Sequence, residues 1–468
     1  MSYVSYSLER HQKSAAFLVT ATLFFCVHQA FDISIFYYDS DQYWLLAGQL
    51  LDFPATYRGY FSAFLFFPTK IICDTFPILG LLPFRLGSSI AYALFFAVLL
   101  PDVFVTLFGG CVSFSRRLLA PVLFCCLFPG LLLYPLTDLP AVALLVSAAW
   151  CLLRSIGASR ARQIFLVLLS GFLAYGAYNT RTIYAFSFAF LIGILFVAGR
   201  RKKTIFGNWL ALTTVFLMGA AIAAVPQIII NKKRTDTLSP FVGTDIGGGS
   251  SLFAKQLVWG ITLQRYETSV DEGLPGASLY YLDPAGEKFF QEQSINASSF
   301  KVSEYIILAL NNPIDIIGIV GRHLINGLDV RDGMVYTRTL SSKKGALSVL
   351  NFLVLFGAVL VLLAPTAKMN SDRHAGKTKL FFWIAYFLLP VAAILPGAVE
   401  TRFFLPLHLL IYSVLAFRFD YRMQMETLRR HWFAIALALV ASASIYFAVT
   451  QSTMASLKFT YPTQYRGM

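Results

Sequence analysis

Long runs of apolar residues recur along this chain, from Ala15 to Val449. Each run is close to the ~20 residues that an α-helix needs to cross the hydrocarbon core of a bilayer. Charged residues make up 13% of the 468 residues, about half the share found in soluble domains. Because backbone polar groups find no water inside a bilayer, such runs must form helices. The sequence therefore predicts an all-α polytopic membrane protein.

The apolar runs predict about eleven transmembrane helices. They cover residues 14–34, 88–109, 118–134, 139–155, 163–179, 182–198, 207–229, 345–365, 379–397, 403–417 and 431–450. Every second connection is rich in arginine and lysine, as Arg116 and Arg117 show after the second span. This alternation predicts a cytoplasmic N-terminus and an external C-terminus. We expect a multi-pass protein of a plasma membrane, such as a bacterial inner membrane.

The formal net charge of +14 has a topological explanation. The positive residues lie in short loops, where they set the orientation of the helices, so we expect the bilayer and no nucleic acid as a partner. The six cysteines form no CxxC pair and no cluster with histidine, and they are interpreted as packing residues.

Two long outer connections divide the predicted chain. Residues 1–230 form an N-terminal transmembrane module, 231–344 an extracytoplasmic region, and 345–468 a C-terminal transmembrane module. The first outer connection, 35–87, contains the apolar pieces Phe61–Phe67 and Ile71–Leu82, which are too short or too broken to span. They predict helices that lie in the membrane interface.

The second connection, 231–344, has ordinary polarity. Glu287–Phe300 and Ser303–Asn311 have helical patterns, and Pro313–Leu328 is an apolar segment expected to pack on the membrane face. The glycine-rich stretch Gly243–Gly249 lacks the GK[ST] ending of a phosphate-binding loop, so it is interpreted as a flexible loop.

Two carboxylates follow the first span directly, in YYDSDQYW. If a helix begins there, Asp39 and Tyr43 share a face and Asp41 points elsewhere. If the segment is extended, the two aspartates share a face. An ionisable group at the membrane surface is a candidate functional residue. The structural alternative is that Asp39 or Ser40 caps the helix.

Further ionisable residues fall on the same predicted outer side. Asp138 lies in the turn TDLP, where it is equally well explained as a helix cap. Arg181 and Tyr184 lie in YNTRTIY, and Glu400 and Arg402 lie in ETRFFLP. An internal Glu400–Arg402 or Glu400–Arg181 ion pair is the structural alternative. The gathering of these residues on one side predicts a candidate site.

This layout resembles the GT-C superfamily of membrane glycosyltransferases, which includes dolichyl-phosphate-mannose protein mannosyltransferases and aminoarabinose transferases. Those families carry an acidic pair and a tyrosine after the first helix, similar to Asp39, Asp41 and Tyr43. An acid in a later outer turn is similar to Asp138, and a late E-x-R-F-x-x-P stretch is similar to Glu400–Pro406.

The resemblance implies an inverting glycosyltransferase. The donor would be a sugar on a polyprenyl phosphate, and the acceptor a glycan, a lipid or a protein on the extracytoplasmic face. Asp39, Asp41 and Asp138 would be the catalytic carboxylates. Asp39 or Asp41 would be the general base, and the spacing of Asp39 to Tyr43 favours Asp39.

Cationic side chains would bind the phosphate of the donor. The main candidates are Arg58, Arg181 and Arg402, and Lys70 and His323 are reserve candidates. Tyr43, Tyr184 and Glu400 would support the site. We predict no cofactor and no dedicated metal site, although a divalent cation could assist at the phosphate.

Another class of membrane protein shares much of this pattern. Polysaccharide polymerases, ligases and lipid-linked-glycan transporters also combine many helices with outer arginines, but they have no need of the acidic pair after the first helix. That pair is therefore the feature that favours the glycosyltransferase.

Overall fold

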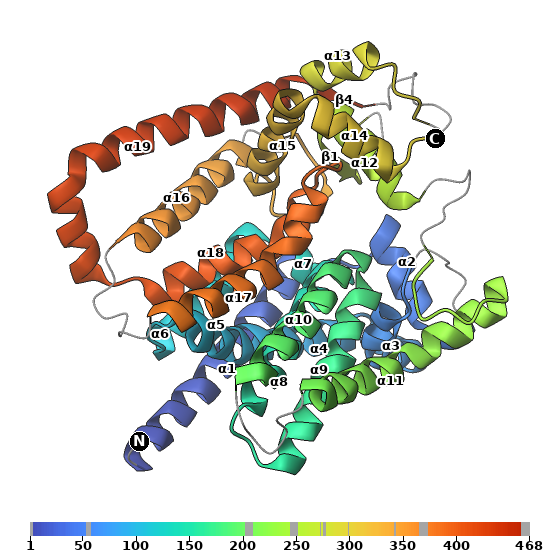
Figure 1. The fold of residues 1–468 in the computed structure, drawn as a ribbon, viewed down its shortest axis with the longest axis vertical. Helices are drawn as coiled ribbons and strands as arrows, with labels where there is room; N and C mark the ends of the chain where they lie inside the picture. The colour runs from blue at the N-terminus through green and yellow to red at the C-terminus, as the bar shows by residue number, and fades with distance from the viewer. Residues whose placement is uncertain are drawn as a thin grey trace. The chain divides into compact units, whose positions relative to one another are not determined.

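The computed structural model describes most of the chain. The described residues are 3–52, 58–201, 209–243, 251–271, 273–274, 278–297, 299–340, 343–364 and 373–459. Most of the glycine-rich stretch, 244–250, lies outside them. The chain forms two compact units, built mainly from α-helices (Figure 1). One comprises 1–242, 368–390 and 412–418, and the other comprises the remaining residues. The three-part division expected from the sequence stays a prediction.

The first unit contains the N-terminal helices. They are α1 (Tyr3–Phe31), α2 (Tyr38–Ala47), η1 (Leu50–Asp52), α3 (Phe61–Thr75), η2 (Pro77–Leu79), α4 (Leu82–Leu94), η3 (Phe95–Leu99), α5 (Leu100–Phe108), α6 (Phe114–Leu127), α7 (Gly130–Leu133), α8 (Asp138–Ser155), α9 (Arg160–Thr180), η4 (Thr182–Tyr184), α10 (Ala185–Arg201) and α11 (Trp209–Thr235). Parts of α17 (Arg373–Ile394) and α18 (Leu405–Arg418) complete it.

The second unit combines helices with a small β-sheet. Its further elements are α12 (Leu252–Thr262), β1 (Leu263–Ser269), β2 (Ser278–Leu282), α13 (Pro284–Glu292), α14 (Val302–Asn311), α15 (Pro313–Leu328), β3 (Tyr336–Thr337), α16 (Lys343–Leu363), η5 (Thr401–Phe404), α19 (Tyr421–Ala455) and β4 (Leu457–Lys458). The strand order is β3-β1-β2-β4, with β1 antiparallel to β2 and parallel to β3. The sequence had not predicted these strands.

Seven described helices are long and apolar enough to cross a bilayer. They are Glu9–Phe31, Leu82–Phe108, Asp138–Ser155, Arg160–Thr180, Leu210–Thr235, Lys344–Leu363 and Tyr421–Ala455. All seven coincide with predicted spans, which confirms an α-helical polytopic membrane protein. An eighth candidate is the pair α14–α15, whose helices meet at a bend of 112°. The first helix of this pair confirms the helix predicted at 303–311, and the apolar segment 313–328 is helical as well.

The four other predicted spans correspond to shorter helices. The described segments are Phe114–Leu127, Thr182–Leu195, Phe381–Ile394 and Leu405–Arg418. At 14 residues, α6 is about 21 Å long, shorter than the ~30 Å hydrocarbon core. The structure thus supports seven spans, or eight with the bent pair, and the count of eleven stays a prediction.

The first outer connection forms more continuous helix than expected. Phe61–Thr75 is one helix that continues through Pro68, and only a short 3₁₀ turn, η2, follows it. The prediction of two separate helices, at Phe61–Phe67 and Ile71–Leu82, was therefore wrong in its boundaries. In the second connection, α13 covers Pro284–Glu292, so the helix predicted at 287–300 begins earlier and ends sooner.

Two glycines let α9 and α11 pack backbone to backbone. A Cβ at Gly171 would lie 1.9 Å from the Phe216 carbonyl oxygen, and a Cβ at Gly219 would lie 1.9 Å from that of Leu168. Small residues at such contacts are typical of helix pairs in membranes, where close packing drives association.

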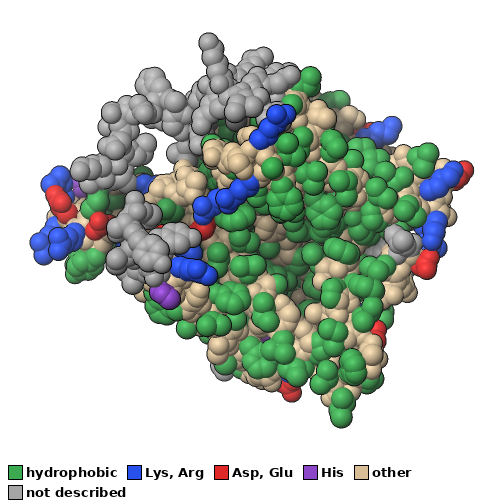
Figure 2. Space-filling model, turned by 90° about the horizontal axis from the view of Figure 1, so that it is seen from below, with side chains coloured by type: hydrophobic (Ala, Val, Ile, Leu, Met, Phe, Trp, Pro, Cys, Tyr) green, Lys and Arg blue, Asp and Glu red, His purple; other side chains and the backbone are tan. Residues whose placement is uncertain are grey.

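The surface carries many large apolar side chains. In Figure 2, hydrophobic side chains cover much of the visible face. On α11, for example, Met218, Ile222 and Val225 are each at least half exposed. A surface of this kind is expected where lipid replaces water.

Candidate functional site

Ser40 fixes the start of α2. Its hydroxyl accepts a hydrogen bond from the Tyr37 N–H at 3.1 Å and donates one to the Tyr37 carbonyl at 2.7 Å. A side chain that reaches back from the third helical position is half of a capping box. Of the two residues that the sequence offered as caps, Ser40 fills the role, which leaves the Asp39 carboxylate available for another contact.

Asp39 contacts Arg58, which precedes α3. The Arg58 Nη2 lies 2.6 Å from Oδ1 of Asp39 and 2.9 Å from Oε1 of Gln42. The guanidinium carbon also lies 4.5 Å from the centre of the Tyr43 ring, a cation–π distance. Asp39, Gln42 and Tyr43 thus form one face of α2 directed at Arg58, as the helical reading of the motif predicts.

Asp41 lies on a different face of α2. Its side chain is half-buried, and no residue in the described part of the chain forms a hydrogen bond or an ion pair with its carboxylate. The two aspartates therefore differ in environment, although they are two residues apart.

Asp138 and Arg181 form a second ion pair. Asp138 is the first residue of α8, and Arg181 follows the last residue of α9. The Arg181 Nη1 contacts Oδ1 of Asp138, whose side chain is 3% exposed. Tyr184 is buried in the same turn, and its N–H donates to the Arg181 carbonyl at 3.0 Å. Asp138 therefore serves as an arginine partner at the start of α8.

Asn179 joins the segments that carry these two pairs. Its Oδ1 accepts a hydrogen bond from the Phe61 N–H at 2.8 Å. A Cβ at Gly59 would lie 1.7 Å from the backbone carbonyl oxygen of Asn179, so this close approach of the two segments requires glycine at position 59. Arg58 directly precedes Gly59, and Arg181 lies two residues after Asn179. The two predicted phosphate-binding arginines of the first unit are thus on neighbouring segments.

An aromatic contact brings the acidic residues onto neighbouring segments as well. Phe36 and Tyr134 have ring centroids 6.4 Å apart. Phe36 precedes Asp39 by three residues, and Tyr134 precedes Asp138 by four. Four predicted site residues therefore come from segments that are packed together within the first unit.

The remaining predicted residues lie in the second unit. Glu400, 7% exposed, forms a two-point ion pair with Arg402, through Oε2 with Nε and through Oε1 with Nη2 at 3.0 Å. This is one of the internal pairs that the sequence offered as the structural alternative. His323 is fully buried, with Nδ1 2.6 Å from the Leu395 carbonyl and Nε2 3.0 Å from that of Leu263. Both ring nitrogens face the backbone, which favours a structural role over phosphate binding.

Lys70, the other reserve candidate, lies in α3 of the first unit. Its Nζ is 2.6 Å from Oδ1 of Asp74, one helical turn away. This local pair accounts for the position of the lysine.

The second unit also contains a buried polar network that the sequence analysis missed. The Asp329 carboxylate, 0% exposed, is within hydrogen-bonding distance of Arg331, Ser348 and Tyr446, at 2.5, 2.5 and 2.8 Å. The signal was present in Asp329-Val-Arg331, because residues two apart in an extended segment share a face.

A second part of this network lies on β1. Arg265 and Glu267, also two residues apart, form an ion pair at 2.7 Å, and Lys344 lies 3.9 Å from the Glu267 carboxylate. Burial raises the pKa of Glu267, but the charges of Arg265 and Lys344 and a hydrogen bond from Thr337 outweigh this effect, so its pKa lies below the usual value. Glu267 is therefore held ionised.

The fold defines a class, that of α-helical integral membrane proteins that cross the bilayer several times. Among the described residues, no group of three or more histidine, cysteine or acidic side chains is placed to hold a metal ion. Comparison with protein-family models, with curated proteins and with solved structures finds no match to this chain. Its family and activity are therefore matters for proposal.

Proposed function

We propose that this protein is an inverting glycosyltransferase that takes its sugar from a polyprenyl phosphate. The observation that carries the proposal is the pairing of Asp39 with Arg58 and of Asp138 with Arg181 on segments joined through Asn179. Such a reaction needs carboxylates for proton transfer and arginines for the phosphate, and this part of the first unit supplies both.

In the proposed reaction, an acceptor hydroxyl oxygen attacks the anomeric carbon of the donor sugar. The bond from that carbon to the phosphate oxygen breaks with inversion, and the base takes the hydroxyl proton. Polyprenyl phosphate leaves with the bonding electrons. Negative charge grows on the phosphate, so preorganised cations lower the barrier. Arg58 and Arg181 are the proposed cations.

Asp41 is the proposed general base. A base needs a free lone pair within reach of the hydroxyl, and the Asp41 carboxylate has no partner among the described residues, whereas Asp39 binds Arg58. This assignment departs from the preference for Asp39 that spacing alone suggested. Asp39 instead orients Arg58, and Tyr43 supports the same guanidinium through its ring. The donor sugar, the acceptor and the extracytoplasmic orientation belong to the same proposal.

The test is transfer activity of the purified protein with a panel of polyprenyl-phosphate sugars. We expect sugar release or transfer with at least one donor. Asp41→Asn should reduce turnover on the order of a hundredfold or more, because an amide takes up no proton at neutral pH. Asp39→Asn should give a milder loss. Asp32→Asn is the matched control, since Asp32 is an exposed residue paired with Arg85 just before the motif.

The thermal midpoints of the Asp41→Asn, Asp39→Asn and Asp32→Asn variants in detergent must stay close to that of the parent, so that a loss of turnover does not reflect unfolding. If Asp39→Asn were the more damaging change, the base would be Asp39. Full activity in both Asp39→Asn and Asp41→Asn would overturn the assignment as a glycosyltransferase and favour a polysaccharide polymerase, a ligase or a lipid-linked-glycan transporter.

A further inference from the structure

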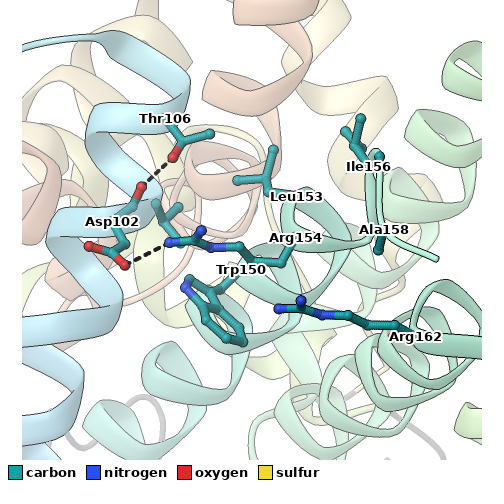
Figure 3. A pocket seen from close by; sticks show the side chains of 10 residues that line it. Asp102, Thr106, Trp150, Leu153, Arg154, Ile156, Ala158 and Arg162 are labelled. Carbon is teal, nitrogen blue, oxygen red and sulfur yellow. Dashed lines mark hydrogen bonds and ion pairs between the residues drawn. The ribbon is translucent and has the colours of Figure 1, made fainter. Parts of the chain in front are cut away.

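A cavity of about 350 Å³ lies in the first unit, between the end of α8 and the start of α9 (Figure 3). The side chains that the inference uses are those of Asp102 from α5, Trp150 and Arg154 from α8, and Arg162 from α9. α8 has 18 residues, so it is about 27 Å long. Asp138 is its first residue, and the cavity therefore lies at the opposite end of this helix from the proposed active site.

Asp102 is surrounded by more positive charge than it can neutralise. Its carboxylate lies 3.1 Å from Lys13, 3.0 Å from Arg154 and 3.5 Å from Arg117. The nearby acid Glu9 pairs with Lys13 at 3.2 Å. With Arg162 included, four cations and two carboxylates leave a net charge of +2 at the cavity. A surplus of this kind favours an anion.

The position of Asp102 is fixed by the helix that carries it. Pro101 has no N–H, so it cannot donate the helical hydrogen bond to the carbonyl of Ala97. Arg117, 1% exposed, donates to that carbonyl at 2.7 Å from Nη1 and reaches Asp102 with Nη2. One arginine thus satisfies the freed carbonyl and anchors the carboxylate. The part of the cavity wall that carries Asp102 is therefore held by helix packing and hydrogen bonds, while residues 156–158 line the cavity from the turn between α8 and α9.

Two lining side chains have donors left over. The Arg162 guanidinium forms no ion pair with any described residue. In Figure 3 its side chain extends into the cavity toward Trp150, in the direction of Arg154 and Asp102. The indole Nε1 of Trp150 is buried and has no hydrogen-bond partner in the described part of the chain. Arg154 adds a guanidinium 5.6 Å from the Trp150 ring.

We propose that this cavity binds the headgroup phosphate of an anionic phospholipid. Arginine grips phosphate oxygens in pairs, and the indole N–H supplies a further donor. Basic pockets between transmembrane helices are typical sites for anionic headgroups. A lipid is favoured over a soluble ligand because the cavity lies where two candidate spans, Asp138–Ser155 and Arg160–Thr180, end and begin. The inference does not depend on the proposed glycosyl transfer.

The experiment measures lipid binding by the full-length protein with native mass spectrometry from detergent. The probes are dioleoyl phosphatidylglycerol, dioleoyl phosphatidylcholine and inorganic phosphate. We expect phosphatidylglycerol to bind more tightly than phosphatidylcholine. Arg162→Gln should weaken phosphatidylglycerol binding about fivefold, and Arg154→Gln with Arg162→Gln by about twenty-five-fold, at ~1 kcal/mol for each arginine.

Arg160→Gln is the matched control, because Arg160 is an exposed residue of the same turn that does not line the cavity. It should bind phosphatidylglycerol as the parent does. The thermal midpoint without lipid should be unchanged in Arg162→Gln, since this change removes no ion pair. Equal affinity of the parent and the double variant would overturn the proposal. So would binding of inorganic phosphate as tight as that of phosphatidylglycerol, which would indicate a site for soluble phosphate.

Discussion

Arg58 and Arg181 have very different surroundings, although each is paired with an aspartate. Asp39 is 39% exposed at its side chain, so its pair with Arg58 is open to solvent and can rearrange when a ligand arrives. Asp138 is 3% exposed, and a buried carboxylate left without its arginine costs several kcal/mol. Of the two, Arg58 is therefore the arginine that can more readily leave its carboxylate for a phosphate.

Arg402 offers a test that separates donor binding from a structural role. Arg402→Ala leaves the buried Glu400 carboxylate without its two-point partner, so we expect a lower thermal midpoint. Arg402→Lys keeps the positive charge but loses the paired N–H donors of the guanidinium. It should therefore lower the thermal midpoint and the donor affinity less than Arg402→Ala does. Binding of a polyprenyl-phosphate sugar, measured beside stability, distinguishes the two roles.

Glu400→Gln is the matched control for this prediction, because it weakens the same pair from the other side. Equal loss of stability in Arg402→Ala and Glu400→Gln, with unchanged donor affinity in both, would make Arg402 structural.

Glu267 gives a prediction with a defined pH dependence. Its pKa is lowered in the folded protein, so its ionisation contributes stability above the unfolded value of 4.5 that is lost as the pH falls. Glu267→Gln removes the partner of the buried Arg265 and should destabilise the protein by about 3 kcal/mol at pH 7. Unfolding in detergent should show the difference from the parent shrinking as the pH falls below 4.5. Glu292→Gln, in an exposed pair with Lys288, should change little.

At the residue scale, part of the candidate site could be predicted from the spacing of residues along the sequence. Asp39 and Tyr43 share a helix face, as the i, i+4 rule predicts, and both contact Arg58. The partner of Asp138 was not predictable, because Arg181 is 43 residues away and nothing local links them. The same holds for Asp41, because the lack of a partner for its carboxylate among the described residues depends on how the chain folds.

The close packing of α9 against α11 depends on the absence of a Cβ atom at Gly171. In Gly171→Ala, the new Cβ would lie 1.9 Å from the Phe216 carbonyl oxygen, so the helices must move apart. We expect a loss of about 2 kcal/mol, the usual cost of overpacking. Gly193→Ala is the matched control, because its Cβ would meet nothing within 4 Å. Thermal midpoints of both variants check this, and equal midpoints would contradict the close packing.

At the scale of elements, apolar length located the helices well and the strands poorly. Seven spans follow from runs of about 20 apolar residues. The sheet was missed because β1 shows no regular alternation of buried and exposed positions, and because β3 and β4 have two residues each and acquire their structure from partners distant in sequence. β4 pairs with β2 across more than 170 residues of chain, which no local pattern encodes.

For the whole molecule, the alternating basic loops make a prediction about sidedness. In a cysteine-free background, Lys288→Cys should react with an impermeant thiol reagent from outside intact cells, and Ala161→Cys should react only after permeabilisation. Both positions are exposed. The reverse pattern would contradict the predicted orientation and with it the extracytoplasmic site.

The candidate span α19 is interrupted by a kink. It has 35 residues, but the backbone at His431 is not helical, so 24 residues, 432–455, follow the kink. This part is about 36 Å long, whereas α8, with 18 residues, is about 27 Å long. Two spanning helices that differ by about 9 Å cannot both match one hydrocarbon thickness unless the longer one tilts or the bilayer deforms around it. The acyl-chain length of the surrounding lipid is therefore expected to act on this protein mechanically, through hydrophobic mismatch.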